Sequence, residues 1–210
     1  MESNITATAF SQRDPRWRAE PLGAGPAKIG QVGCLLTASA AMLATWGVDT
    51  DPQRLNRWLI ANQGYADGNR LRFSAIAPLG VYFAAFINCA TVPAPLPQLI
   101  QAVEGGAGVL VCMDSQPGGV LQPHWVYITS LNKTDGQVVD PWQLPGRENG
   151  RLAAYLAPGW DIARGIFHVA IYRRSQVTPL PPQRKLSQPR SGRKSRAIVQ
   201  ASLYEYTRGK

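Results

Sequence analysis

The sequence predicts an α+β domain in which an antiparallel sheet packs against an N-terminal helix. Helix-forming segments without breakers occur in the first half of the chain, and short runs of β-branched and aromatic residues occur in the second half. A chain of 210 residues, 45% of them hydrophobic, can bury one substantial core. Because the helices and strands are segregated rather than alternating, βαβ units are not expected.

The first long helix is predicted to begin at Cys34. The preceding residues 10–33 are rich in Gly and Pro and show no periodicity, so we expect a loop there. The run CLLTASAAMLATW then consists mainly of good helix formers, and Gly47 stands where a left-handed C-cap would end it. Cys34 is therefore expected in the first turn of this helix.

A second helix is predicted from Asp51, which suits the N-cap, and Pro52, which suits the first helical position. It continues through LNRWLIAN, whose apolar residues share one face. Shorter helices are expected over residues 74–79 and 98–104.

Four runs of strand type follow these helices: GVLVCMD, HWVYITSL, QVVD and GIFHVAIYRR. The sequence NKTDG between the second and third runs predicts a hairpin turn. Together these runs predict the antiparallel sheet.

The domain is expected over residues 1–174, followed by a basic, Pro-rich tail over residues 175–210. The tail has eight Lys or Arg residues against Glu205 alone, so it carries +7 of the formal net charge of +9. Its prolines and cations leave too little apolar surface to offset the entropy of ordering. We expect either a solvated extension or an anchor for an anionic polymer or a larger protein assembly.

Several classes of protein do not fit this sequence. The three cysteines form no close pair of the kind found in zinc ribbons or redox dithiols, so we expect no metal, no cofactor and no disulfide framework. The N-terminus lacks the pattern of a secretory signal, and the longest apolar stretches are too short to cross a bilayer. We therefore expect a protein that is cytoplasmic as synthesised, or part of a virion.

Cys34, His124 and Asp140 form a candidate catalytic triad. The positive end of a helix favours the thiolate that nucleophilic chemistry requires. His124 begins one predicted strand and Asp140 ends the next, so adjacent antiparallel strands would bring them together. The carboxylate would fix the tautomer of the imidazole, which could then take the proton from sulfur. The alternative for Cys34 is a small buried residue at a helix start.

The segments SQRDPRW, IGQVGCLLTASAAML, HWVYITS and VVDPW carry a family resemblance. Over roughly residues 10–173 the chain resembles the peptidases related to the bacteriocin leader (double-glycine) peptidases, a branch of the papain-like cysteine peptidases. The resemblance implies a papain-like fold and a cysteine peptidase. It also implies an oxyanion hole formed by the backbone N–H of Cys34 and an upstream glutamine. Gln12 matches that glutamine best, and Gln31 is the competing assignment.

Other residues invite two interpretations. Trp125 and Trp142 flank the proposed base and its orienting carboxylate, so they could wall a substrate cleft or pack in the core. Cys89 and Cys112 lie in apolar runs and are expected to be inert core thiols. His168 is expected to be a hydrogen-bonded strand histidine without a catalytic role.

The expected function is hydrolysis of an amide bond in a peptide. The resemblance suggests peptidoglycan peptides or leader peptides as substrates. A rival hypothesis is a structural or adaptor component of a phage virion or a secretion assembly, with the basic tail as its docking element. Acyl transfer by the same three residue types is a third.

Overall fold

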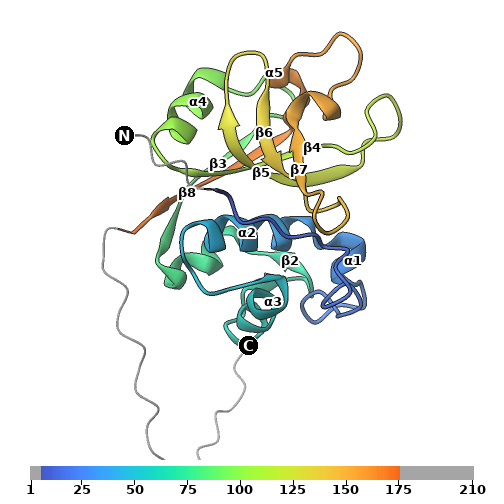
Figure 1. Ribbon diagram of the computed structural model, residues 1–210, viewed down its shortest axis with the longest axis vertical. Coiled ribbons are helices and arrows are strands. Elements are labelled where there is room, and N and C mark those ends of the chain that lie inside the picture. The colour runs from blue at the N-terminus through green and yellow to red at the C-terminus, as the bar shows by residue number, and fades with distance from the viewer. Residues whose placement is uncertain (1–5, 176–210) are drawn as a thin grey trace, which may run out of the picture. The chain divides into compact units, whose positions relative to one another are not determined.

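Helix α2 (Cys34–Thr45) lies between helix α3 (Pro52–Ala61) and a six-stranded sheet in the computed structural model of the chain (Figure 1). The structure describes residues 6–175, which all belong to the first of two units of the chain, residues 1–179. The predicted tail, apart from Ser175, is outside the described residues.

The large sheet is antiparallel throughout, with the strand order β3-β8-β4-β5-β6-β7. Its strands are β3 (Val81–Asn88), β4 (Gly108–Asp114), β5 (Pro123–Leu131), β6 (Gly136–Val139), β7 (Asn149–Arg151) and β8 (His168–Arg174). The remaining elements are α1 (Ile29–Val32), β1 (Tyr65–Ala66), β2 (Arg70–Leu71), η1 (Phe73–Leu79), α4 (Leu96–Glu104), η2 (Leu152–Tyr155) and α5 (Ile162–Gly165).

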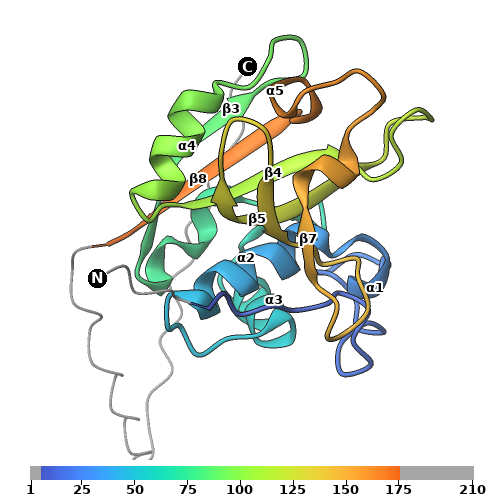
Figure 2. The ribbon, with the colours of Figure 1, turned by 45° about the horizontal axis from the view of Figure 1, so that its top comes forward.

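Both faces of the sheet are covered, and each face has its own apolar cluster. Helix α2 packs on one face, and α4 lies on the opposite face (Figures 1 and 2). The α2 side buries Leu36, Leu43 and Tyr172, whereas the α4 side buries Leu99 and Val111. This double cover explains why the central strand β4 is a continuous apolar run rather than an alternating one.

Two glycines fix the position of α2. Gly47 follows the helix with a φ of 88°, so it ends α2 in the left-handed conformation that the sequence predicted. On β4, a Cβ at Gly108 would collide with the side chains of Met42 and Trp46. The absence of a side chain at this position lets α2 approach the sheet closely.

The prediction of an α+β domain with an antiparallel sheet is confirmed. The two long helices and the four predicted strands agree with the structure within a few residues. Strand β3 was not predicted, because both faces of GVYFAAFINCA are apolar enough to hide the alternation of a strand. Within residues 6–175, no helix has both the length and the apolar character needed to span a membrane.

Candidate active site

Cys34 is the first residue of α2 and follows α1 after Gly33 alone. A Cβ at position 33 would lie 2.5 Å from the carbonyl oxygen of Ile29, so the sharp junction between the two helices requires glycine. The first N–H groups of a helix lack partners inside it and give that end a partial positive charge. The half-buried Cys34 therefore lies at the positive end of α2.

His124 and Asp140 meet because β5 and β6 are antiparallel neighbours. His124 is the second residue of β5, and Asp140 directly follows the last residue of β6. The Nε2 atom of His124 lies 2.6 Å from Oδ1 of Asp140, and both side chains are buried. A carboxylate only accepts hydrogen bonds, so Nε2 carries the proton and Nδ1 is left for another partner.

The Asp140 carboxylate accepts four hydrogen bonds. In addition to His124, Oδ1 accepts from the backbone N–H of Trp142 at 2.8 Å. The other oxygen, Oδ2, accepts from the Tyr155 hydroxyl at 2.5 Å and from Nε2 of Gln143 at 2.7 Å. This donor set holds the carboxylate in one orientation. The sequence offered no sign of the Tyr155 contact, because Tyr155 comes from a separate short helical turn, η2.

The charges of this pair follow from the contacts. Burial alone would lower the pKa of His124, but the hydrogen bond to Asp140 and the interaction with the Cys34 thiol outweigh it and raise this pKa from 6.5 to about 9. Burial alone would raise the pKa of Asp140. The hydrogen bond and positive charge of His124, with two further hydrogen bonds, instead bring it below the ordinary value of 3.8. An imidazolium paired with a carboxylate is therefore favoured at neutral pH.

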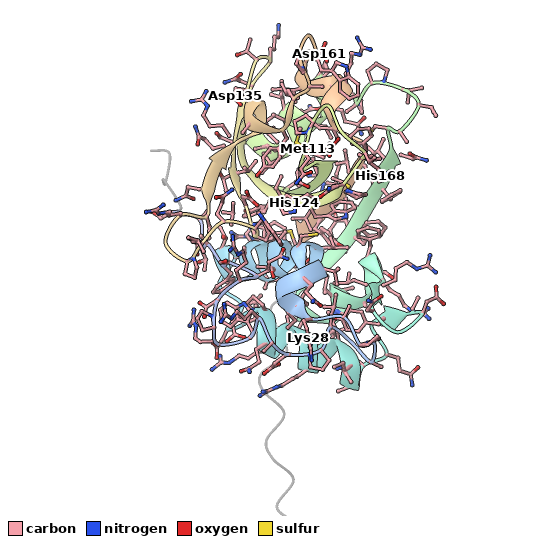
Figure 3. The ribbon with its side chains drawn as sticks, turned by 90° about the vertical axis from the view of Figure 1, so that its right-hand side faces the viewer. Lys28, Met113, His124, Asp135, Asp161 and His168 are labelled. Carbon is pink, nitrogen blue, oxygen red and sulfur yellow. The ribbon has the colours of Figure 1, made fainter. Side chains whose placement is uncertain are left out.

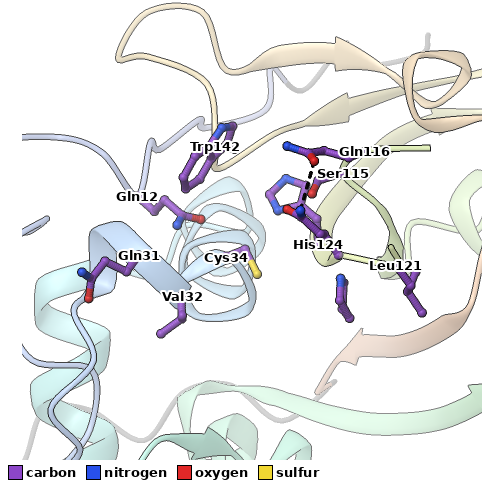
Figure 4. A pocket seen from close by; sticks show the side chains of 11 residues that line it. Gln12, Gln31, Val32, Cys34, Ser115, Gln116, Leu121, His124 and Trp142 are labelled. Carbon is purple, nitrogen blue, oxygen red and sulfur yellow. Dashed lines mark hydrogen bonds between the residues drawn. The ribbon is translucent and has the colours of Figure 1, made fainter. Parts of the chain in front are cut away.

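Cys34 and His124 line one pocket of about 470 Å³, and the sulfur points to the side on which His124 lies (Figure 4). The structure thus brings Cys34, His124 and Asp140 into one site. The pocket also contains residues that the sequence did not single out: Val32, Ser115, Gln116, Leu121, Gln122 and Pro123. Most of these come from the β4–β5 loop. In the sequence, the apolar Val120 and Leu121 follow two glycines just before His124, and this pattern could have indicated a loop that lines the site. Both side chains are exposed.

The two candidate glutamines differ in their surroundings. Gln12 is almost fully buried, and its Nε2 donates to the carbonyl oxygen of Gly30 at 3.3 Å. Its buried Oε1 has no hydrogen-bond partner within residues 6–175, a situation that costs about 1–3 kcal/mol in typical proteins. The exposed Gln31 instead accepts from the backbone N–H of Lys28 at 3.0 Å through its Oε1. Both residues line the pocket.

The Gln12 segment is attached to the loop that follows Asp140. The backbone N–H of Gln12 donates to the carbonyl oxygen of Pro141 at 2.7 Å, and the Ser11 hydroxyl donates to the carbonyl oxygen of Gln143. Trp17 fixes the same segment by donating from its indole nitrogen to the Ser11 carbonyl oxygen at 2.8 Å. The Gln12 segment and the loop after Asp140 therefore form one hydrogen-bonded unit.

The two predicted wall tryptophans lie in different places. Trp142 lines the pocket and is 46% exposed, with the guanidinium of Arg13 above its ring at 5.3 Å. Trp125 is not among the pocket-lining residues. It packs against Phe73, with ring centroids 5.6 Å apart, and this is the core-packing alternative for that residue.

The other thiols and the second histidine lie outside the pocket lining. Cys89 and Cys112 are buried, and burial raises the pKa of the Cys112 thiol to about 12. His168 begins β8, and its ring stacks against Phe86. We expected His168 to be fully hydrogen-bonded, but its buried Nδ1 has no partner among the described residues. Figure 3 shows both histidines on the sheet side of the molecule.

Comparison with known proteins gives little beyond this geometry. No protein-family model matches the chain, and no curated protein matches it. Among solved structures, the chain is similar to a Bacillus anthracis protein described as a C39-like peptidase, with 16% sequence identity and a TM-score of 0.47. The match covers 84% of this chain and 98% of that one. At this level, the likeness alone assigns neither a family nor an activity.

No metal site is evident in the described part of the chain. Within residues 6–175, no group of three or more His, Cys, Asp or Glu side chains is arranged to bind a metal ion.

The three thiols should differ in reactivity. Limiting iodoacetamide at neutral pH, followed by peptide mapping, should label Cys34 well before Cys89 or Cys112, because the latter two are buried and burial raises their pKa values. Unfolded protein serves as the control and should label evenly. Equally slow labelling of all three in the folded protein would favour a structural role for Cys34.

Replacement of Asp140 by Asn should lower the pKa of His124. The carboxylate would be lost, and an amide NH₂ would face groups that are themselves donors, so the unfolding free energy should fall by about 1–3 kcal/mol. The pKa is measured by NMR titration of the imidazole, with His168, the only other histidine, as internal control. An unchanged His124 pKa would contradict the assigned pairing.

The same pair predicts a pH dependence of stability. Because the folded-state pKa of His124 is above 6.5, its stabilisation is fully present below pH 6.5 and is lost as the pH rises through about 9. The unfolding free energy of the wild type should therefore decrease over this range, and the decrease should be smaller in Asp140→Asn.

Proposed function

We propose that this protein is a cysteine peptidase with a papain-like arrangement, in which Cys34 is the nucleophile, His124 the base and Asp140 the orienting residue. The observation that carries the proposal is the buried His124–Asp140 pair, held at 2.6 Å beside a thiol at the positive end of a helix. This combination in an open pocket is more typical of a catalytic site than of a structural domain.

The first half of the reaction forms an acyl-enzyme. The Cys34 sulfur attacks the carbonyl carbon of a peptide bond as the thiolate, its proton having passed to Nδ1 to form the imidazolium of His124. The C–N bond breaks as the imidazolium returns the proton to the departing nitrogen, which leaves as an amine. Asp140 keeps the ring in the tautomer and orientation that both transfers require.

The second half releases the acyl group. A water molecule gives a proton to Nδ1 of His124 while its oxygen attacks the thioester carbonyl. The C–S bond breaks, the carboxylic acid leaves, and the Cys34 thiolate and the His124 imidazolium are restored. The enzyme is then in its starting state.

The negative oxygen that develops in both halves needs donors aimed at it. The backbone N–H of Cys34 is at the first helical position, where no partner inside the helix is available. Gln12 supplies the second donor in this proposal. One hydrogen of its Nε2 is occupied by the Gly30 carbonyl oxygen, and an amide nitrogen has a second hydrogen to donate.

The pocket suits an extended peptide. Its floor carries polar groups such as Gln12 and His124, and its rim carries the exposed apolar side chains of Val32, Leu121 and Trp142. Apolar rims around convergent polar groups are typical of sites that bind organic substrates. Peptidoglycan peptides and leader peptides are the substrates that the family resemblance suggests.

Catalysis should depend on Cys34. Wild type and Cys34→Ala are incubated with peptide libraries and with cell-wall fragments, and products are identified by mass spectrometry. We expect cleavage by the wild type and none by Cys34→Ala, because no other thiol lines the pocket. Cys89→Ala is the matched control and should retain cleavage. Two results would overturn the proposal: cleavage by Cys34→Ala, or no cleavage by the wild type of any peptide library or cell-wall fragment.

The two glutamines should be separable by their kinetics. Loss of one oxyanion donor costs roughly 10²- to 10³-fold in kcat, so Gln12→Ala should show a loss of that size. Gln31→Ala should lose far less, because the Gln31 side chain points away from Cys34 (Figure 4) and its Oε1 is held by the Lys28 backbone N–H. Gln101→Ala, an exposed substitution on α4, is the control and should leave kcat unchanged. A larger loss in Gln31→Ala than in Gln12→Ala would reverse the assignment.

A further inference from the structure

A second hollow lies next to the catalytic pocket, and its charged lining is entirely cationic. It has a volume of about 310 Å³ and is lined by Arg13, Arg18, Ala19, Lys28, Gly30 and Gln31. Three of these six residues carry a positive charge, and none carries a negative one. We refer to it below as the basic hollow.

Two of the cations of the basic hollow, Arg18 and Lys28, lie on backbone segments that are hydrogen-bonded to each other. The N–H of Gly30 donates to the carbonyl oxygen of Arg18 at 3.0 Å, and the N–H of Ile29 donates to that of Glu20 at 2.9 Å. Lys28 is held next to this contact by an antiparallel bridge to Pro21. The backbone segments that carry Arg18 and Lys28 are thus fixed to each other. Both side chains line the basic hollow, and no loop has to become ordered to bring them there.

These charges have no acidic partner within residues 6–175. No ion pair between described residues involves Arg13, Arg18 or Lys28. The nearby carboxylates are engaged elsewhere, since Asp14 pairs with Arg16 and Glu20 pairs with Arg57. An anion in the basic hollow would therefore not displace an existing partner.

The basic hollow and the catalytic pocket share a wall. Gln31 lines both, and the neighbours Gln12 and Arg13 line one each. The Arg13 guanidinium also lies over Trp142, a residue of the catalytic pocket. A chain bound beside Cys34 that passes Gln31 would enter the basic hollow directly. In Figure 3, Lys28 projects from the helical layer below His124.

We propose that the basic hollow is a substrate subsite that binds a carboxylate of the peptide cleaved at Cys34. The proposal rests on the proposed peptidase function and narrows its substrate class to peptides with an acidic group at a fixed distance from the cleaved bond. Arginine and lysine are the natural partners of a carboxylate, and a planar guanidinium can bind it in a bidentate manner. The carboxylate can belong to an acidic side chain or to the C-terminus of the peptide.

The test compares the substrate preferences of four full-length proteins, the wild type and three double variants. Libraries of decapeptides with blocked ends contain Glu, Gln or Lys at each position in turn, and cleavage products report both rate and register. With two exposed ion pairs to the carboxylate, Glu should be preferred over Gln by about three- to tenfold, or about 0.7–1.4 kcal/mol, at one position relative to the cleaved bond. A parallel set with a free C-terminus distinguishes a terminal carboxylate from a side chain.

The double variant Arg18→Gln/Lys28→Gln should lose this preference and cleave the Glu and Gln peptides at similar rates. Arg13 is left intact, because it neighbours Gln12 and touches Trp142. Lys133→Gln/Arg164→Gln removes the same charge from residues that line neither hollow and should keep the preference. Arg18→Glu/Lys28→Glu should turn the preference towards Lys peptides. The preference should also weaken at high salt.

Two results would overturn the subsite. One is equal cleavage of Glu and Gln peptides at every position. The other is an acidic preference that is independent of position, or is lost equally in Lys133→Gln/Arg164→Gln, which would indicate general attraction by a basic chain.

A second measurement separates this proposal from the catalytic one. Full-length Cys34→Ala is immobilised, and retained peptides of the same library are sequenced by mass spectrometry. Enrichment of Glu that disappears in Arg18→Gln/Lys28→Gln supports the subsite even if no cleavage is found. Cleavage without such enrichment would reject the subsite and leave the peptidase proposal intact.

Discussion

The buried carboxylate of Asp140 is the group on which the candidate site depends. It orients His124, and it also accepts from the backbone of Trp142 and from Tyr155. A single unpaired carboxylate would be costly at this depth, and the four donors together make it stable and immobile. Because the Gln12 segment is bonded to the loop after Asp140, the same carboxylate anchors the base and, indirectly, the proposed oxyanion donor.

Much of the fold could be predicted because its main elements have strong local signals. The helix from Cys34 has a run of good helix formers and a glycine at its end, and the strands over residues 108–114 and 124–131 are short apolar runs between turns. The missing elements lack such signals. β7 has three residues and α5 has four, so neither is long enough for its pattern to repeat twice. Their conformations are imposed by neighbours rather than by local sequence.

In the candidate site, too, the parts with local sequence signals could be predicted and the parts without them could not. Cys34, His124 and Asp140 could be predicted because residue type, helix position and strand order together bring them into one place. The Tyr155 contact and the basic hollow could not, since both join segments that are distant in sequence through packing alone. Trp125 illustrates the limit of reasoning from a neighbour in sequence. Adjacent residues of a strand point to opposite faces, so its position next to His124 did not place it in the same pocket.

The pocket is assembled from two distant stretches, residues 12–34 and residues 115–142, and neither contains a working set of groups by itself. A nascent or partly unfolded chain would have the thiol without its base, or the base without its thiol. If the chain is a peptidase, it is inert until the last strands of the sheet are in place. In that case the order of folding itself limits proteolysis of neighbouring proteins during synthesis.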